Sequence, residues 1–303
     1  MLIKSKTESG RILYRSKPLL LDAKAGYTRP GPGKAWFATT TTVWRVDELV
    51  RRKVRDWRRL TGETGHDGTR AETMRKDHES VYTGTSSVFP APLVEWVLLR
   101  YGGPQGGQVL DAFAGGPPRG LVSAIMGYKY VGVELRAEQI AENQAVLRGL
   151  KLTATYIQGD GRFLEGVSSG HGATLFDVAF TCPPYHDLEQ YSDSPDDLSN
   201  MRTYWEFNAG MALCAESHRR LMKPGAFVCV VVGPIRDKHG ELIDLPAHTV
   251  QNFREAGFIY HQQIVLFKNF GSAAKRSTNA WRGLKLVPIH EILQVFRTPQ
   301  NDT

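Results

Sequence analysis

From about residue 88 onward, short apolar segments alternate with amphipathic ones, and this alternation constrains the fold more than any other feature of the sequence. Runs rich in Val, Leu and Phe, such as residues 108–113 (QVLDAF) and 226–232 (AFVCVVV), are typical of buried strands. Segments with apolar residues at intervals of three or four positions, such as residues 137–147, are typical of helices. Strands that alternate with helices predict a parallel sheet covered by crossover helices.

The predicted order of elements is that of a doubly wound α/β sheet with a Rossmann-like arrangement. We expect strands at residues 108–113, 130–134, 154–158, 176–180, 226–232, 262–267 and 291–296. We expect helices at residues 92–101, 119–126, 137–147, 204–221 and 249–256. The last two strands follow each other without a predicted helix, so we expect them to form a terminal antiparallel pair. Ligands of such sheets bind beyond the carboxyl ends of the strands.

The net charge of +7 comes from the first third of the chain. Residues 1 to 100 contain 19 Lys and Arg against 11 Asp and Glu, whereas residues 101 to 303 contain 19 against 20. A basic lobe beside a nearly neutral body is typical of proteins with a phosphate-bearing partner, because counterion release favours such binding. A solvated surface that keeps the protein soluble would give the same charge balance.

The first 85 residues are predicted to be a basic N-terminal extension, ahead of a main domain over residues 86–303. Residues 1–45 are rich in Gly, Pro, Thr and Lys and show no sustained period, so we expect a loop or an arm ordered by a partner. Residues 46–60 have the spacing of an amphipathic helix. Its predicted nucleic-acid contacts are Arg51, Arg52, Arg55, Arg58 and Arg59.

Neither a membrane span nor an export signal is predicted. No stretch approaches the roughly 18 uninterrupted apolar residues of a membrane helix, and the N-terminus lacks the apolar core of a signal peptide. The three cysteines, Cys182, Cys214 and Cys229, are too few for a disulfide framework and too oddly spaced for a zinc ribbon. We therefore expect a cytoplasmic protein with reduced thiols and no membrane partner; the sequence leaves its oligomeric state open.

Acidic residues follow three successive predicted strands, which predicts a nucleoside site. The strand at 108–113 runs into a Gly-containing turn that opens a helix, and such turns let a ligand approach backbone amides. Glu134 closes the next strand, 23 residues after Asp111, where an acid can hold both hydroxyls of a ribose. Asp160 follows the third strand and is placed to accept a hydrogen bond from an adenine amino group.

The turn after the first strand favours S-adenosylmethionine over a dinucleotide. The phosphate-binding pattern G-x-G-x-x-G is absent, and Pro117 and Pro118 remove two amides that a pyrophosphate would need. S-adenosylmethionine carries no phosphate, and its sulfonium cation suits a nearby acid such as Asp111. We therefore predict S-adenosylmethionine as the cofactor.

The segment Thr181-Cys182-Pro183-Pro184-Tyr185 follows the fourth strand, and here the sequence resembles the amino-methylating DNA methyltransferases. In that family the fourth motif is an acidic or polar residue followed by Pro-Pro and an aromatic residue. DAFAGG, VGVE and GDGRF resemble its first three motifs, and SVFPAPLVEW resembles its tenth, which lines the methionine end of the cofactor. The resemblance covers roughly residues 86 to 297. FTCPPYHDLEQYSDSPDDLSNM and VVGPIRDKHG resemble a phage- and prophage-borne branch of the family.

The resemblance implies a Rossmann-like methyltransferase sheet, double-stranded DNA as partner and methyl transfer to an exocyclic amino group, with N6 of adenine favoured over N4 of cytosine. The implied cofactor-binding residues are Phe89, Asp111, Phe113, Ala114, Gly115, Glu134, Leu135, Asp160, Gly161, Arg162 and Thr181. The implied catalytic residues are Cys182, Pro183, Pro184 and Tyr185. Methyl transfer needs no metal, so no metal site is expected.

The Pro-Pro motif has a chemical purpose in this family. An exocyclic amine is a poor nucleophile because its lone pair is delocalised into the ring, so acceptors must draw the nitrogen towards tetrahedral geometry. The residue before the prolines and the carbonyl of the first proline are those acceptors, and the aromatic residue stacks on a base flipped out of the duplex. Pro183 would supply the carbonyl here and Tyr185 the stacking platform.

Cys182 departs from the family pattern, which has Asp, Asn or Ser at this position. A neutral thiol is a weak acceptor. In one interpretation amino methylation relies on Pro183, with Thr181 or Asp187 assisting. In the other, Cys182 is a nucleophile that attacks C6 of cytosine and activates C5 for methylation. An RNA substrate, or a DNA-binding protein without catalysis, is compatible with the same motifs.

A second basic region precedes the last predicted strand. Residues 256–290 contain Lys and Arg but neither Asp nor Glu. Residues 186–198, by contrast, are rich in acidic residues, which we expect to orient their loop through turns. The basic segment GSAAKRSTNAWRG is predicted to reach DNA phosphates. Its predicted nucleic-acid contacts are Lys275, Arg276, Trp281 and Arg282.

Overall fold

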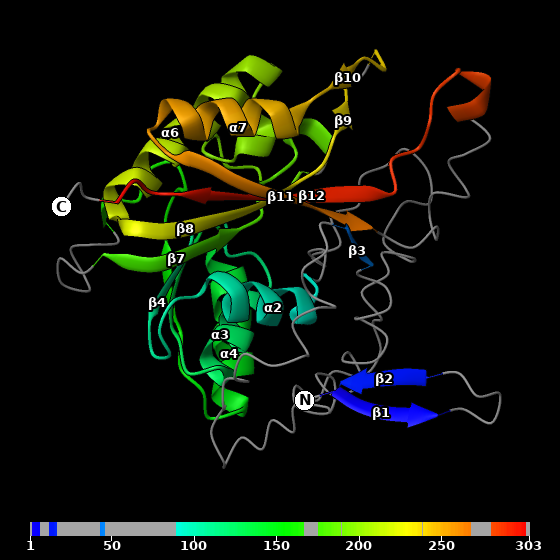
Figure 1. Ribbon diagram of the computed structural model, residues 1–303. Coiled ribbons are helices and arrows are strands. Elements are labelled where there is room, and N and C mark those ends of the chain that lie inside the picture. The colour runs from blue at the N-terminus through cyan, green and yellow to red at the C-terminus, as the bar shows by residue number, and fades with distance from the viewer. Residues whose placement is uncertain are drawn as a thin grey trace.

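A single eight-stranded sheet lies at the centre of the computed structural model (Figure 1). The structure describes residues 2–6, 12–16, 43–45, 89–166, 175–188, 190–237, 239–267 and 280–300. Across the sheet the strands follow the order β3 (Val43–Arg45), β11 (Ile259–Phe267), β12 (His290–Arg297), β8 (Met222–Val232), β7 (Phe176–Thr181), β4 (Gln108–Asp111), β5 (Lys129–Glu134) and β6 (Thr155–Gln158). Within this sheet β12 runs antiparallel to both of its neighbours, and the other pairs are parallel. The predicted Rossmann-like sheet with an antiparallel terminal pair is confirmed.

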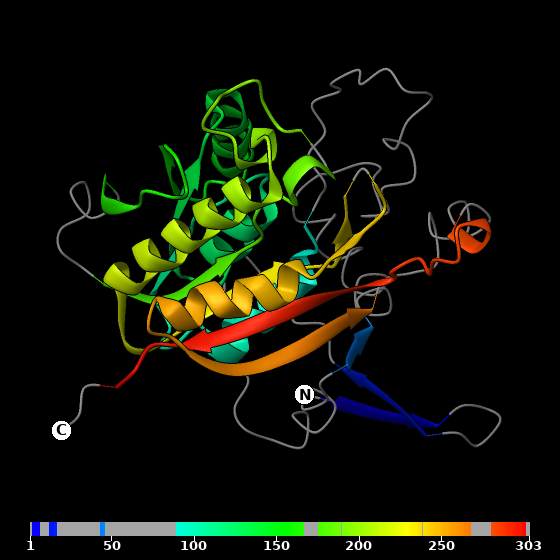
Figure 2. The ribbon, with the colours of Figure 1, turned by 90° about the horizontal axis from the view of Figure 1, so that it is seen from above.

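Helices cover both faces of the sheet, as Figure 2 shows from above. On one face lie α2 (Ala91–Tyr101), α3 (Pro118–Ile125) and α4 (Ala137–Gly149), and on the other lie α6 (Tyr204–Leu221) and α7 (Leu245–Glu255). Successive strand residues point to opposite faces, so Val109 packs into the first core and Leu110 into the second. Both side chains are at most 1% exposed, which explains why the strand sequences are apolar without alternation.

The predicted elements are present, and the structure shifts several of their ends. The predicted helix 204–221 is confirmed at both ends, where Thr203 caps α6 through a bond from the Glu206 amide at 3.2 Å. Helix α7 begins at Leu245 because Asp244 accepts from the Ala247 amide at 3.2 Å. Strand β8 begins at Met222 because that residue pairs with Phe176.

The first 45 residues contain strands where the sequence suggested a loop. Strands β1 (Leu2–Lys6) and β2 (Ile12–Ser16) pair antiparallel, and β3 adds to the edge of the main sheet by pairing parallel with residues 265–267 of β11. Of the two alternatives predicted for residues 1–45, the loop is therefore wrong for these three short segments, which gain backbone hydrogen bonds by pairing with other strands. The predicted helix at 46–60, with its five arginines, lies outside the described residues.

Two small features complete the carboxyl edge of the sheet. A hairpin of β9 (Ile235–Arg236) and β10 (Leu242–Ile243) follows β8. Two 3₁₀ turns, η2 (His186–Leu188) and η3 (Leu198–Asn200), lie between β7 and α6. In the part of the chain that the structure describes, no helix is both long and apolar enough to cross a membrane.

Candidate active site

The loops that follow β4, β5 and β7 are joined by hydrogen bonds at the carboxyl edge of the sheet. The Phe113 amide donates to Oγ1 of Thr181 at 3.2 Å, and the Gly115 amide donates to Oε2 of Glu134 at 2.9 Å. The β4 loop is thus tied to the strands on both of its sides. Gly115 has φ of 51°, a left-handed conformation that suits glycine at this turn.

A buried ion pair supports this loop from below. Asp111 is fully buried, and its Oδ2 accepts from Nε of Arg119 at 2.5 Å and from the Tyr130 hydroxyl at 2.7 Å. Arg119 also donates to the carbonyls of Phe113 and Ala114. Burial, the largest single influence, would lower the pKa of Arg119, but the charges of Asp111, Tyr130 and Cys182 and the hydrogen bond to Asp111 together raise that pKa. Asp111 therefore fixes the loop, and its predicted contact with the cofactor's cation stays a prediction.

Phe89 covers this ion pair on the side of α2. The guanidinium carbon of Arg119 lies 4.7 Å from the centroid of the Phe89 ring, and Phe89 meets Phe180 edge to face at 5.4 Å. Phe89 is half-buried, so one side of the residue remains at the surface. The residue that the sequence assigned to the methionine end of the cofactor thus lies against the β4 loop.

Glu134 receives two backbone amides at the end of β5. Besides the bond from Gly115, its Oε1 accepts from the Arg136 amide at 3.0 Å. Burial raises the pKa of Glu134, and the bonds from Arg136 and Gly115 oppose this increase. A carboxylate offers about four lone-pair sites, so Glu134 retains acceptor capacity for hydroxyl groups. The neighbouring Leu135 uses its carbonyl to accept from Gln158 at 3.3 Å.

The segment after β6 approaches the β4 loop closely. A Cβ built on Gly161 would lie 2.4 Å from the Ala112 carbonyl oxygen and 2.7 Å from the Phe113 ring, so no larger residue fits there. Asp160 accepts from the Arg162 amide at 2.9 Å and from Nε of Arg162 at 2.7 Å. Arg162 in turn pairs with Asp196 of the acidic segment at 3.4 Å.

Thr181, Cys182 and Tyr185 continue this edge beyond β7. Cys182 is half-buried, and a charge on its thiol would add to the raised pKa values of Arg119 and Tyr185. Pro183 is buried and Pro184 half-buried. The Tyr185 hydroxyl donates to Oε1 of Glu291 at 3.1 Å, and burial raises the pKa of Tyr185, with the charge of Glu291 adding to the effect.

The acidic segment folds through turns, as expected from its sequence. Asp197 is buried and accepts from the Ser199 amide at 2.9 Å and from the Ser192 hydroxyl at 2.8 Å. His186, at φ of 49°, anchors the segment's start, with Nε2 at 3.1 Å from the Met201 carbonyl. The acids therefore organise the loop that borders Cys182.

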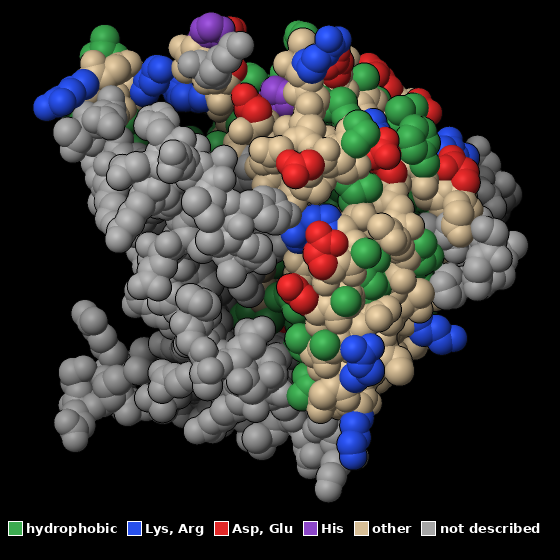
Figure 3. Space-filling model, turned by 180° about the vertical axis from the view of Figure 1, so that it is seen from behind, with side chains coloured by type: hydrophobic (Ala, Val, Ile, Leu, Met, Phe, Trp, Pro, Cys, Tyr) green, Lys and Arg blue, Asp and Glu red, His purple; other side chains and the backbone are tan. Residues whose placement is uncertain are grey.

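Only part of the predicted nucleic-acid surface can be placed. Trp281 and Arg282 are exposed and belong to a short helical segment that precedes β12 in the chain (Figure 1). Trp281 exposes 78% of its surface. Lys275 and Arg276, like the five arginines of residues 51–59, lie outside the described residues. On the face seen in Figure 3, the acidic and basic side chains of the described residues are interspersed.

Sequence reasoning missed three residues of this region. Arg119 holds the β4 loop from inside, and Asn143 donates to the Gly115 carbonyl at 2.7 Å from α4. Phe163 exposes 55% of its surface beside Asp160, with the Arg162 guanidinium 5.5 Å from its ring centroid. The only sequence signal was for Phe163, an aromatic residue directly after the GDGR turn.

Comparison with known proteins gives a structural likeness alone, because neither a protein-family model nor a curated protein matches the sequence. The [4+2]-cyclase SpnF is similar with a TM-score of 0.50 and 15% identity, over 85% of this chain and 97% of SpnF. TrmN from Thermus thermophilus (TM-score 0.48, 14% identity) aligns with 69% of this chain, which spans 49% of the length of TrmN. A TehB-like SAM-dependent methyltransferase from Corynebacterium glutamicum is similar with a TM-score of 0.43 and 14% identity, over 83% of this chain and 98% of that methyltransferase. The chain thus has a Rossmann-like α/β fold.

Proposed function

We propose that this protein is an S-adenosylmethionine-dependent DNA methyltransferase that modifies an exocyclic amino group, with N6 of adenine favoured. The observation that carries the proposal is the Phe113–Thr181 hydrogen bond of 3.2 Å. It joins the loop assigned to the cofactor to the strand end that leads into Cys182 and the two prolines. A methyl donor and an acceptor amine must lie within a few ångströms of each other, and a bond that holds these two loops together supports the proposal.

The residues around the β4 loop fit S-adenosylmethionine. Glu134 keeps acceptor capacity for ribose hydroxyls, and the close approach at Gly161 leaves the Phe113 ring at the border of the site. The exposed ring of Phe163 beside Asp160 supplies a surface on which an adenine can stack. When bound, the cofactor would supply an electrophilic methyl group.

The Cys182–Tyr185 segment would bind the target base. The Pro183 carbonyl can accept an N–H of the target amine, and Cys182 lies beside it as a second, weaker acceptor. The Tyr185 hydroxyl is held by Glu291 at 3.1 Å, which fixes the ring against rotation out of the loop. A fixed ring costs little entropy when it stacks on a base.

Double-stranded DNA as the substrate is supported by the charge of the chain and by one exposed segment. The basic excess lies in residues 1 to 100. Trp281 and Arg282 extend from the carboxyl edge, where a polynucleotide would approach the Cys182 loop. An exposed Trp beside a cation is suited to stacking on bases and contacting phosphates.

The test is mass spectrometry of nucleosides from plasmid DNA, after expression of the wild type and of Cys182→Ala in a host without its own methylases. We expect N6-methyladenine, or N4-methylcytosine, at a reduced level in the variant. 5-Methylcytosine that disappears with Cys182→Ala would instead make Cys182 a nucleophile. Methylated RNA without methylated DNA would reassign the substrate, and binding without any methyl transfer would indicate a non-catalytic DNA-binding protein.

A further inference from the structure

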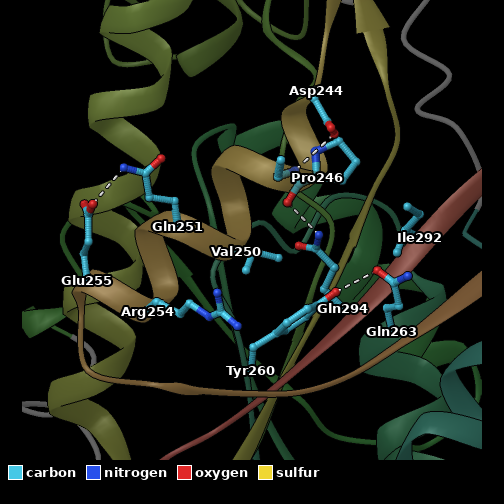
Figure 4. A pocket seen from close by; sticks show the side chains of 11 residues that line it. Asp244, Pro246, Val250, Gln251, Arg254, Glu255, Tyr260, Gln263, Ile292 and Gln294 are labelled. Atoms are coloured by element: carbon cyan, nitrogen blue, oxygen red, sulfur yellow. Dashed lines mark hydrogen bonds between the residues drawn. The ribbon is translucent and has the colours of Figure 1, made fainter.

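A groove whose lining includes none of the candidate active-site residues runs along α7 (Figure 4). Its volume is about 640 Å³, within the range of sites that hold small ligands or short peptide segments. One wall consists of Ala247, Val250, Gln251 and Arg254, which share a side of the helix because they recur at intervals of three and four. The floor comes from β11 and β12.

Gln294 presents a buried acceptor to this groove. Its side chain is 1% exposed, and its Nε2 donates to the Pro246 carbonyl at 2.7 Å, which fixes the orientation of the amide. Its Oε1 is buried and has no hydrogen-bond partner among the described residues. Figure 4 shows this amide on the floor of the groove, facing Val250. A ligand that offers an N–H would satisfy the oxygen.

Charged side chains line both ends of the groove: Asp244 lies at one end, and Arg254 lies at the other beside Glu255, whose Oε1 accepts from Nε2 of Gln251 at 2.8 Å. The exposed Arg254 lies over the Tyr260 ring, 5.6 Å from its centroid, and forms no ion pair within the described part of the chain. The Tyr260 hydroxyl is held in turn by Gln263 at 2.9 Å. At the other end stands Asp244, ten residues earlier, or about 15 Å along a helix.

The charge pattern and the length select one class of ligand. A free amino acid is too short to reach both ends, and a nucleic acid would bring phosphates towards two carboxylates, Asp244 and Glu255. An extended peptide advances about 3.3 Å per residue, so four or five residues span about 15 Å. Peptide N–H groups match the acceptor of Gln294, and Val250 and Ile292 offer an apolar surface for a side chain.

We propose that this groove binds an extended peptide segment of another protein, with a basic end at Asp244, a carboxylate at Arg254 and a backbone N–H at Oε1 of Gln294. The proposal does not depend on the proposed methyltransferase activity. It combines a cavity, a buried unpartnered acceptor and an oriented cation, each observed separately.

The test uses ¹⁵N-labelled full-length protein titrated with the unblocked peptide Lys-Ala-Val-Ala-Glu. Its termini add to the charges of Lys and Glu, whereas in the reversed peptide Glu-Ala-Val-Ala-Lys they cancel them. We expect saturable shifts of the Gln294 and Gln263 side-chain amide signals with the first peptide, and about tenfold weaker binding of the reversed one. Equal affinity for both peptides, or no shift at millimolar peptide, would overturn the proposal.

Two variants and a matched control locate the peptide. Arg254→Ala removes the cation, and Val250→Trp fills the groove, so each should weaken binding about tenfold. Arg148→Ala is the control, since Arg148 is likewise an exposed arginine in the last turn of a helix, on the opposite face of the sheet. Wild-type affinity in both groove variants would contradict the proposal, and a dispersed amide spectrum shows that each variant is folded.

Discussion

At the scale of single residues, Gly161 sets how closely two loops of the candidate site can approach. Gly161→Ala would place a Cβ at 2.4 Å from a backbone carbonyl oxygen, that of Ala112, which cannot move away as a side chain can. We expect a loss of about 1–3 kcal/mol in the free energy of unfolding. We also expect about tenfold weaker binding of S-adenosylhomocysteine by calorimetry. Gly149→Ala is the matched control, because nothing lies within 4 Å of a Cβ there.

Arg119 gives a second prediction at this scale. Arg119→Met leaves the fully buried Asp111 without its cation, and breaking a buried pair costs about 3–5 kcal/mol. Arg220→Met removes an exposed pair with Glu165 and should cost less than about 1 kcal/mol. Urea denaturation measures both. A loss below that of Arg220→Met would show that the buried pair does not support the β4 loop.

These residues also mark what the sequence could predict of the site. Glu134 and Asp160 were identifiable because each follows a strand directly, and the carboxyl ends of parallel strands share one edge. The role of Arg119 could not be identified from the sequence, because an arginine in the first turn of a helix is ordinarily exposed. Its inward course depends on Asp111 and Tyr130, which lie on two separate strands.

At the scale of elements, helix α6 carries a titratable group in its core. His218 is fully buried, its Nδ1 lies 2.8 Å from the Cys214 carbonyl, and burial lowers its pKa below the ordinary value of 6.5. As the pH falls through about 6.5, His218 therefore takes up a proton in the unfolded chain, while in the folded protein its side chain stays neutral. Stability is present above this pH and falls as the pH decreases, by up to about 1.4 kcal/mol per pH unit.

His218→Leu should remove this dependence. Between about pH 7.5 and pH 5.5, we expect the melting temperature of the variant to fall less than that of the wild type. The exposed His239→Gln is the control and should follow the wild type. Parallel pH curves for all three proteins would show that His218 does not control the acid sensitivity of α6.

The helices were easier to predict than the ends of the strands. The start of α6 was predicted correctly, and the structure shows that Thr203 and Glu206 form a capping box there. The start of β8 was predicted at residue 226 instead of Met222, because Lys223, Pro224 and Gly225 suggest a turn. Tertiary bonds extend the strand through them: the Gly225 amide donates to the Pro299 carbonyl at 3.2 Å. Hairpins of two-residue strands, such as β9 and β10, give no periodic signal.

At the scale of the whole molecule, the N-terminal region is joined to the main sheet. Strand β3 pairs with residues 265–267 of β11, so residues 43–45 cover part of an edge strand. An uncovered edge offers unpaired amides and carbonyls to other chains. A chain cut at residue 86 therefore loses both the basic excess and this edge cover, and an experiment on the extension must separate the two losses.

Three chains make that separation: the full chain, residues 41–303, which keep β3, and residues 86–303. If the extension contacts phosphates, the logarithm of the affinity for a DNA duplex should fall less steeply with the logarithm of the salt concentration in residues 86–303, by about 0.9 per lost phosphate contact. Residues 41–303 keep the five predicted arginine contacts of residues 51–59, so their slope should lie between those of the other two chains. Affinity for S-adenosylhomocysteine should stay within about twofold in the chain that keeps β3, because that chain also keeps Thr181 and Glu134, which hold the β4 loop. An identical salt slope in all three chains would mean that the eight excess positive charges of residues 1 to 100 serve solubility and that the duplex is held elsewhere.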